Sequence, residues 1–174
     1  DLLEHLLEMI SETVIEYLTL QIQAGADVVQ IFDTWAGELG WKEYRRFALP
    51  WQKRVIEAIQ HQGTPVFLYV KGSSPFLEEM KESGAAVLSV DWRTPLSEVA
   101  ARIGADTVLQ GNLDPTALYA PPDVVSRLTW ELLDDCQRTT GHIFNLGHGV
   151  LPQTPVESVQ ALVNTVKAYE YGSR

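Results

Sequence analysis

Hydrophobic residues follow two alternating patterns along this chain. At the start they recur every three or four positions, which predicts a helix with an apolar stripe at Leu3, Leu7, Ile10, Val14, Leu18 and Ile22. A different stripe of this helix carries Glu4, Glu8, Glu12 and Glu16, which predicts a solvated face. Short apolar runs then predict five strands, at residues 28–32, 66–70, 87–90, 107–110 and 143–145.

Glycine and proline mark the boundaries between these segments. A glycine stands three residues before each of the first four runs, and Gly141 stands three residues before Phe144, where a left-handed glycine would end a helix. Four dipeptides predict helix starts with a capping side chain and a proline in the first turn: Ser74-Pro75, Thr94-Pro95, Asp114-Pro115 and Thr154-Pro155. A helix is therefore expected after each strand, which favours a parallel sheet buried on both faces.

The length leaves two α/β architectures open. At 174 residues the chain suits a complete five-stranded doubly wound domain. A whole (β/α)₈ barrel would need about 200 residues at least. No linker rich in glycine, serine and proline interrupts the chain, so we expect a single domain over residues 1–174. The opening DLLEHLLEMI resembles the middle of an uncapped helix, which suggests that the chain starts inside a larger protein.

Charge and cysteine usage exclude several classes of protein. Lys and Arg number 13 against 23 Asp and Glu, a net charge of −10 without any basic tract, so nucleic-acid binding is not expected. No apolar run is long enough to span a membrane. The single Cys136 allows no disulfide framework and fits a reducing compartment, so we expect a cytoplasmic protein.

Chemistry in parallel α/β folds collects where strands end and helices begin. Five segments occupy such places, and each carries a polar or charged group: 33–37, 71–74, 91–93, 110–114 and 145–149. They contain no G-x-G-x-x-G, no phosphate-binding P-loop and no G-x-S-x-G elbow. The four histidines are scattered and have no cysteine partner nearby, so we expect neither a metal nor an organic cofactor.

Each polar side chain in these segments has two readings. Asp33 suits a general acid or base, or a cap for the next helix; Thr34 suits a donor to a ligand carboxylate, or a bond within its own turn. His148 lies between two glycines and can donate to an anion, or be an ordinary exposed turn residue. Lys71 and Arg93 offer positive charge for a ligand, or are solvated chain ends.

Several strings at these strand ends resemble one known family. They are QIFDTWAGELG, RRFALPW, LSVDWRTPL, LQGNLDPTALYAPP and IFNLGHGVLPQTPVESV, in order along nearly the whole chain. They resemble the uroporphyrinogen decarboxylases of tetrapyrrole (haem) biosynthesis. The resemblance implies a (β/α)₈ barrel, a homodimer and a carboxy-lyase that uses no metal or organic cofactor. That enzyme removes carbon dioxide from the four acetate side chains of uroporphyrinogen and leaves coproporphyrinogen.

The resemblance also assigns site residues. The residue after FD in FDTWAG contacts the substrate in the family and is Thr34 here, and the histidine of NLGHG, which binds a substrate acid group, is His148. Phe32 and Asp33 are candidates to line the cleft. The chain corresponds to the last five strand-helix units of eight. The family's essential carboxylate and its arginine-rich loop belong to the absent N-terminal part, so no catalytic residue is assigned here.

Two alternatives stay open beside the decarboxylase. One is a non-catalytic half barrel that binds a porphyrin or a partner, because an incomplete barrel exposes two strand edges. The other is a zinc methyltransferase that takes methyl groups from corrinoid proteins, a related branch that needs thiolates at strand ends. Val70-Lys71-Gly72-Ser73 and Gly147-His148-Gly149 supply none. The charge of −10 would itself repel a polycarboxylate unless basic segments elsewhere attract it.

Overall fold

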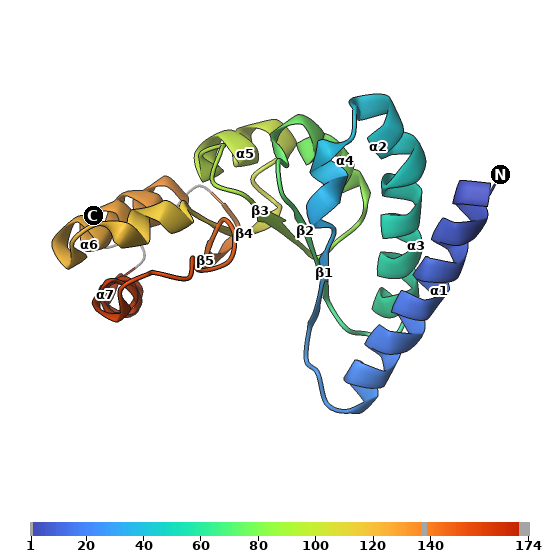
Figure 1. Cartoon of the computed structure of the whole chain (residues 1–174), viewed down its shortest axis with the longest axis horizontal. Helices are drawn as coiled ribbons and strands as arrows, with labels where there is room; N and C mark the ends of the chain where they lie inside the picture. Colours follow the sequence, from blue (N-terminus) through green and yellow to red (C-terminus); the bar gives the residue numbers. More distant parts are fainter. Residues whose placement is uncertain (1, 137–138, 171–174) are drawn as a thin grey trace. The chain divides into compact units, whose positions relative to one another are not determined.

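The structure is a computed structural model that describes residues 2–136 and 139–170. Helices and strands alternate along the chain (Figure 1). The strands are β1 (Val29–Phe32), β2 (Val66–Val70), β3 (Val87–Val90), β4 (Val108–Leu113) and β5 (Gly141–Leu146). The α-helices are α1 (Leu2–Gln23), α2 (Trp41–Phe47), α3 (Leu49–Gln60), α4 (Leu77–Glu82), α5 (Leu96–Ile103), α6 (Pro122–Asp135) and α7 (Val156–Ala168). Short 3₁₀ helices are η1 (Thr34–Glu38), η2 (Ser74–Phe76) and η3 (Pro115–Tyr119).

The order of the strands decides between the two architectures. They form one sheet in the order β1-β2-β3-β4-β5, in which β1 pairs with β2, and β4 with β5, in parallel. A doubly wound sheet reverses its strand order at a switch point, whereas a (β/α)₈ barrel adds each strand beside the previous one. The sheet never reverses, so the fold is part of a (β/α)₈ barrel, and the complete doubly wound domain is excluded.

Two compact units divide the chain, one up to Leu88 and one from Ser89 onward. In the first unit α1 lies alongside α3, and β1 pairs with β2 (Figure 1). Its core consists of side chains with no solvent exposure, which come from α3, β2 and α4: Ile56, Ile59, Val66, Leu68, Leu77 and Met80. Val29 of β1 is buried as well, so apolar side chains from strands and helices together stabilise this unit.

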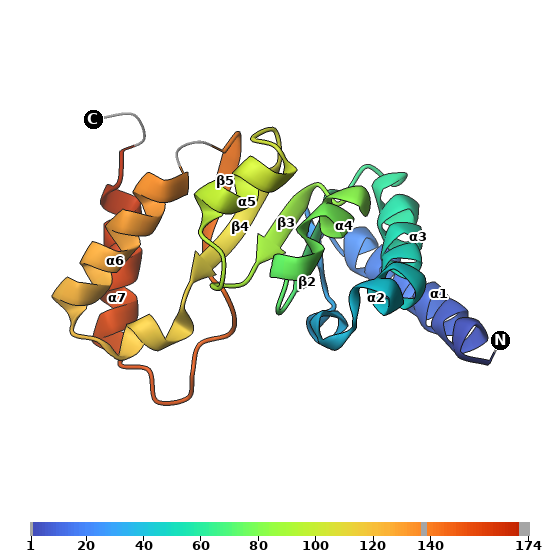
Figure 2. The same ribbon diagram turned by 90° about the horizontal axis from the view of Figure 1, so that it is seen from above.

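The second unit pairs β4 with β5 and packs α6 alongside α7 (Figure 2). Its core includes Leu96, Leu109, Leu118, Val125 and Leu133, each at most 1% exposed. β3 and β4 are buried along almost their whole length, as the nearly continuous apolar pattern predicts. β1 and β5, which stand at the two ends of the strand order, are more exposed.

The predicted positions of the strands are confirmed, but the predicted bounds of two strands are wrong. β4 continues to Leu113 and β5 runs from Gly141 to Leu146, so residues expected in loops lie in the sheet. Their backbones pair as Gly111↔Phe144, Asn112↔Asn145 and Leu113↔Leu146. A side chain at Gly111 would place its Cβ 2.7 Å from the Val90 carbonyl oxygen, so glycine is needed there. Gly141 is itself the first residue of β5 and does not end a helix.

Helix starts follow the prediction only in part. Asp114 caps η3 as expected, because its carboxylate accepts from the Thr116 backbone N–H at 2.8 Å. Pro95 and Pro155 occupy the capping positions of α5 and α7 themselves, and neither cap is made by a side chain. Ser73 rather than Ser74 precedes η2, again with no side-chain cap. Proline fixes φ near the helical value, so it defines these starts without a side-chain hydrogen bond.

The exposure of side chains on α1 differs from the predicted buried and solvated faces. In the apolar stripe Leu18 is buried, whereas Leu3 and Ile10 are 44% and 49% exposed. The glutamate stripe is not simply solvated. Arg46 of α2 pairs with Glu4 at 3.3 Å, and Arg54 of α3 pairs with Glu8 at 3.6 Å and with Glu12. The pattern of one helix cannot reveal arginines on its neighbours, so this row of ion pairs was missed.

No helix in the described ranges combines the length and the apolar character needed to cross a membrane.

Candidate functional site

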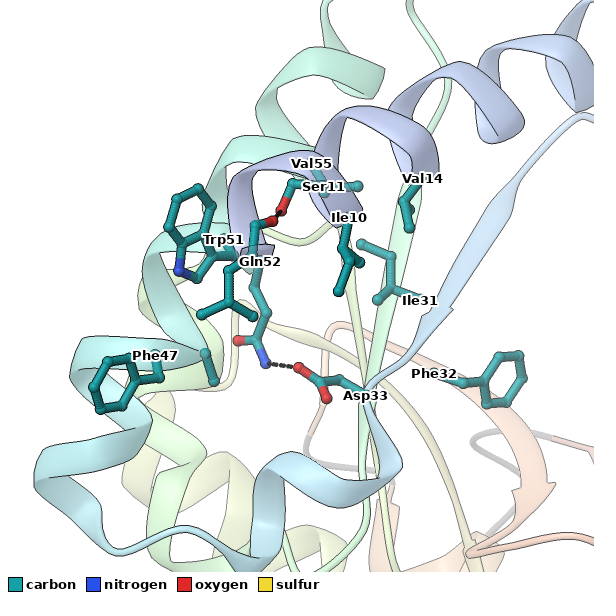
Figure 3. A pocket seen from close by; sticks show the side chains of 12 residues that line it. Ile10, Ser11, Val14, Ile31, Phe32, Asp33, Phe47, Trp51, Gln52 and Val55 are labelled. Carbon is teal, nitrogen blue, oxygen red and sulfur yellow. Dashed lines mark hydrogen bonds between the residues drawn. The ribbon is translucent and has the colours of Figure 1, made fainter. Parts of the chain in front are cut away.

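At the end of β1, the last strand residue Phe32 and the next residue Asp33 point their side chains in different directions. Figure 3 shows the Phe32 ring on one side of the strand and the Asp33 carboxylate on the other, directed at α3. Phe32 is 70% exposed. Asp33 accepts a hydrogen bond of 2.9 Å from Gln52 Nε2, and the Tyr44 hydroxyl donates to Gln52 Oε1 at 3.0 Å. Phe32 therefore faces away from the helices and is available to a ligand, whereas Asp33 is fastened to them.

The Asp33 contacts favour a structural role for this carboxylate. Gln52 is buried and Tyr44 has no solvent exposure, and burial raises the pKa of the Tyr44 hydroxyl, which stays protonated and keeps donating. The amide of Gln52 thus links β1 to α2 through α3. Sequence patterns gave no sign of Gln52 or Tyr44, because a polar residue inside a helix looks solvated until the fold buries it.

Two cavities open beside Asp33, on its helix side. One, of about 270 Å³, lies among α1, β1 and α3 and has mostly apolar walls, with Ser11, Asp33 and Gln52 as polar groups (Figure 3). The other, of about 340 Å³, is lined by Trp35 and Leu39 together with residues of α1 and α2. Their walls carry no cation, so neither suits a polyanionic ligand.

Thr34 begins η1 directly after β1 and is partly buried. Its hydroxyl makes no hydrogen bond within the described part of the chain, so its donor is available to a ligand. The turn is held against the end of β2, because a side chain at Gly37 would overlap the Lys71 carbonyl oxygen. Lys71 is half-buried, and among the described residues it forms no ion pair. This close approach explains the glycine of FDTWAG.

His148 is exposed beyond the end of β5. The preceding Gly147 donates its backbone N–H to the Leu113 carbonyl at 2.8 Å, and a Cβ at Gly147 would lie 2.5 Å from the Trp92 backbone nitrogen. A Cβ at Gly149 would meet nothing within 4 Å. Gly147 therefore lets two loops pack closely and fixes the backbone before His148, whereas Gly149 is under no steric constraint.

Buried polar groups tie the strand ends of the second unit together. Asn112 of β4 donates from Nδ2 to the carbonyl oxygens of Asp91 and Thr94, at 2.8 and 2.7 Å. The Asp91 carboxylate is fully buried and pairs with Arg93. Sequence reasoning left Arg93 open and did not single out Asn112, because its role depends on contacts across strands.

The predicted site residues belong to different units: Phe32, Asp33 and Thr34 lie in the first, and His148 lies in the second. Each follows or ends a strand at its carboxyl end, as the strand-end rule requires. The structure separates Asp33 from its neighbours by turning its side chain toward α3.

Comparison with known proteins shows to which family the chain belongs. The sequence model of the family described as Uroporphyrinogen decarboxylase (URO-D) matches residues 1–169. The chain belongs to the uroporphyrinogen decarboxylase family. The resemblance seen in the strand-end strings is confirmed, and the family match covers the strands, helices and turns described above.

Curated relatives share about two residues in five. The chain is 42% identical to a uroporphyrinogen decarboxylase of Ralstonia pickettii, over 100% of this chain and 49% of that protein. It is 42% identical to one of Thermus thermophilus, over 93% of this chain and 47% of that protein. For one of Hydrogenovibrio crunogenus the identity is 39%, over 94% of this chain and 48% of that protein. The chain spans about half the length of the curated relatives it matches.

A solved structure supports the same fold. A methyltransferase from Methanosarcina mazei matches this chain with a TM-score of 0.78 at 27% sequence identity. The match covers 90% of this chain and 46% of that protein. The chain therefore resembles a portion of this methyltransferase, as it does of the uroporphyrinogen decarboxylases.

Proposed function

We propose that the chain supplies part of the substrate cleft of a uroporphyrinogen decarboxylase. The family match over residues 1–169 carries this proposal. The reaction breaks the bond between each acetate methylene and its carboxyl group, releases carbon dioxide and leaves a methyl group once the carbon is protonated. A protonated pyrrole accepts the electron pair, so the enzyme needs to stabilise charge and orient acid groups, which side chains can do.

Thr34 and His148 are the residues proposed to bind the substrate. The Thr34 hydroxyl has no hydrogen-bond partner among the described residues, and the His148 imidazole is exposed. Either group can donate a hydrogen bond to a carboxylate. Phe32 is proposed to line the cleft with its exposed ring. Asp33 is proposed as a neighbour that holds β1 to α3, because its carboxylate is bound to Gln52.

No residue of this chain is proposed as the catalytic group. The family resemblance implies that the essential carboxylate belongs to the part of the barrel that this chain does not match, so we expect the chain alone to bind substrate and not to turn it over. The single domain over residues 1–174, the homodimer of the full-length enzyme and the cytoplasmic location stay predictions.

The proposal is tested by measuring turnover by this chain alone and by this chain mixed with the complementary half of a relative. Uroporphyrinogen is supplied to this chain alone and to this chain with the half of the Ralstonia pickettii protein that it does not match. We expect coproporphyrinogen and carbon dioxide only from the mixture. The chain alone and the mixture should both bind uroporphyrin. Absence of binding and of turnover in both samples would contradict the proposal.

A non-catalytic half barrel that binds a porphyrin or a partner is the second candidate, favoured by the more exposed strands β1 and β5 at the two ends of the strand order. Binding of uroporphyrin without turnover in the mixture would support it, and robust turnover by the chain alone would exclude it.

A zinc methyltransferase is supported only by the likeness to the Methanosarcina mazei protein. The sole cysteine, Cys136, is buried after α6 and does not follow a strand end. Zinc found in the purified chain by elemental analysis would favour this reading.

A further inference from the structure

A cationic side chain, that of Arg93, stands on a loop next to the His148 loop in the second unit. Arg93 follows β3, and its guanidinium is held on two sides, by the Asp91 carboxylate and by the Trp92 ring at 4.6 Å from the ring centroid. The Arg93 side chain is 47% exposed, whereas that of Asp91 is fully buried. The guanidinium is thus fixed in place with part of its surface open to solvent.

The backbone on both sides of Arg93 is fixed as well. Asn112, itself buried on β4, donates to the Asp91 carbonyl at 2.8 Å and to the Thr94 carbonyl at 2.7 Å. A loop tied at both ends loses little freedom when a ligand binds, so less binding free energy is lost to ordering.

Packing places the loop that carries Arg93 against the loop that carries His148. A Cβ at Gly147 would lie 2.5 Å from the Trp92 backbone nitrogen, so these two backbones are in close contact. Arg93 and His148 are the next residues along their respective loops. The carboxyl ends of β3 and β5 therefore present a guanidinium and an imidazole on neighbouring loops.

The guanidinium keeps donors for a ligand. Arginine has five N–H groups, and the pair with Asp91 uses Nη1. Arg93 makes no further hydrogen bond within the ranges that the structure describes. Arg127 of α6 differs, because it is a simple surface residue that pairs with Glu131 one turn later at 2.7 Å. A planar guanidinium with open N–H groups fits a carboxylate in bidentate geometry.

We propose that Arg93 is an anion-binding residue that, beside His148, binds a carboxylate group of a polycarboxylate ligand. Asp91 acts as its positioning residue, because the buried carboxylate and the Trp92 ring hold the guanidinium. That the ligand is a tetrapyrrole rests on the proposed function, whereas recognition of a polycarboxylate rests on Arg93 and its contacts.

Two probes separate these claims. The full chain is titrated with uroporphyrin and with benzene-1,2,4,5-tetracarboxylate, which has no pyrrole ring. We expect Arg93→Gln to raise the dissociation constant of both about five- to tenfold, and Arg93→Lys about two- to threefold, because lysine keeps the charge without the planar fork. Arg127→Gln, which changes the net charge equally, should leave both constants unchanged.

A double variant distinguishes binding from structural support. In Asp91→Asn with Arg93→Gln no buried carboxylate needs neutralising, and urea unfolding reports whether the fold is kept. Weak binding by a folded double variant supports the proposal, and binding equal to that of the wild type overturns it. Binding of the tetracarboxylate but not of uroporphyrin would overturn the proposed function alone. Failure of the unaltered chain to bind either probe would overturn both.

Discussion

The candidate functional residues of this chain are single residues at the strand ends. His148 stands beyond β5 with its ring exposed, and Gly147 fixes the loop that carries it. Phe32 and Asp33 are neighbours in sequence but point to different sides of β1 (Figure 3). These adjacent residues have different surroundings, because Phe32 ends the strand whereas Asp33 already stands in the turn before η1.

Replacing His148 tests its proposed contact with a substrate acid group. In an active complex of this chain with the complementary half, His148→Ala should weaken substrate binding by about 1 to 3 kcal/mol, since a charge-assisted hydrogen bond is lost. Steady-state kinetics measures KM and kcat. His61→Ala, at the end of α3, is the matched control. Unchanged KM and kcat in the His148 variant would refute the assigned role.

Gly147 and Gly149 make a matched pair of substitutions on the two sides of that histidine. Gly147→Ala should lower the free energy of unfolding by about 1 to 3 kcal/mol, because its Cβ would clash with the Trp92 backbone. Gly149→Ala should change it by less than about 0.5 kcal/mol, since open space surrounds that position. Urea unfolding measures both. Equal effects would show that Gly147 is not under steric constraint.

His142 gives the stability of the chain a dependence on pH. Its Nε2 donates to the Gly111 carbonyl at 2.6 Å, and its Nδ1 lies 3.0 Å from Cys136 Sγ. Burial lowers the pKa of the His142 imidazole below 6.5, although the Gly111 contact opposes this. The unfolded chain therefore takes up this proton at a higher pH than the folded chain does.

The consequence is a loss of stability on acidification. The His142 contribution is complete above pH 6.5 and falls as the pH drops from there through the lowered pKa of the folded state. Urea unfolding at pH 7.5 and pH 5.5 should show a larger drop in the wild type than in His142→Gln. The same drop in both would mean that another group controls the pH response.

Among the elements, the strands could be predicted from the sequence, whereas the contacts made by helix residues could not. All five apolar runs are strands, because a run that is buried on both faces needs little information from distant residues. The extension of β4 through Gly111 and Asn112 was missed, since polar and glycine residues there are satisfied by partners on β3 and β5. The candidate residues Phe32, Thr34 and His148 were found by their place after strands, whereas Gln52 and Tyr44 lie on helices far along the chain.

The outer face of α1 shows what the helical period alone cannot tell. Leu6, Met9, Tyr17 and Leu20 are 50%, 56%, 62% and 63% exposed, and they lie on one stripe of the helix. Leu18, on the opposite stripe, is 6% exposed. An apolar stripe predicts that one side of a helix is buried. When a helix has two apolar stripes, the pattern does not show which of them the described part of the chain buries.

Polar substitutions on α1 separate these two stripes. Leu6→Gln and Met9→Gln should leave the free energy of unfolding within about 0.5 kcal/mol of the wild type, because both side chains are largely exposed. Leu18→Gln should lower it by about 2 kcal/mol or more, because it buries an amide among apolar groups. Urea unfolding measures all three. A large loss for Leu6→Gln would show that its stripe is covered in solution.

For the molecule as a whole, the ends of the strand order matter most. β1 has only β2 beside it and β5 has only β4, within the strands that the structure describes. Unpaired edges expose backbone N–H and C=O groups and favour association. We expect the isolated chain to self-associate between micromolar and millimolar concentrations. Sedimentation velocity at rising concentration measures this, and a single monomeric species throughout would contradict it.

The two edges are unlike, and this limits how such an association could end. A contact between β1 of one copy and β5 of the next is head-to-tail, so it leaves one free edge of each kind at the ends of the assembly. Unless the rotation between copies closes a ring, each added copy exposes a free strand edge of the same kind as the edge to which it was added. Chain growth would then stop only when one edge met a segment that pairs with it and offers no further edge.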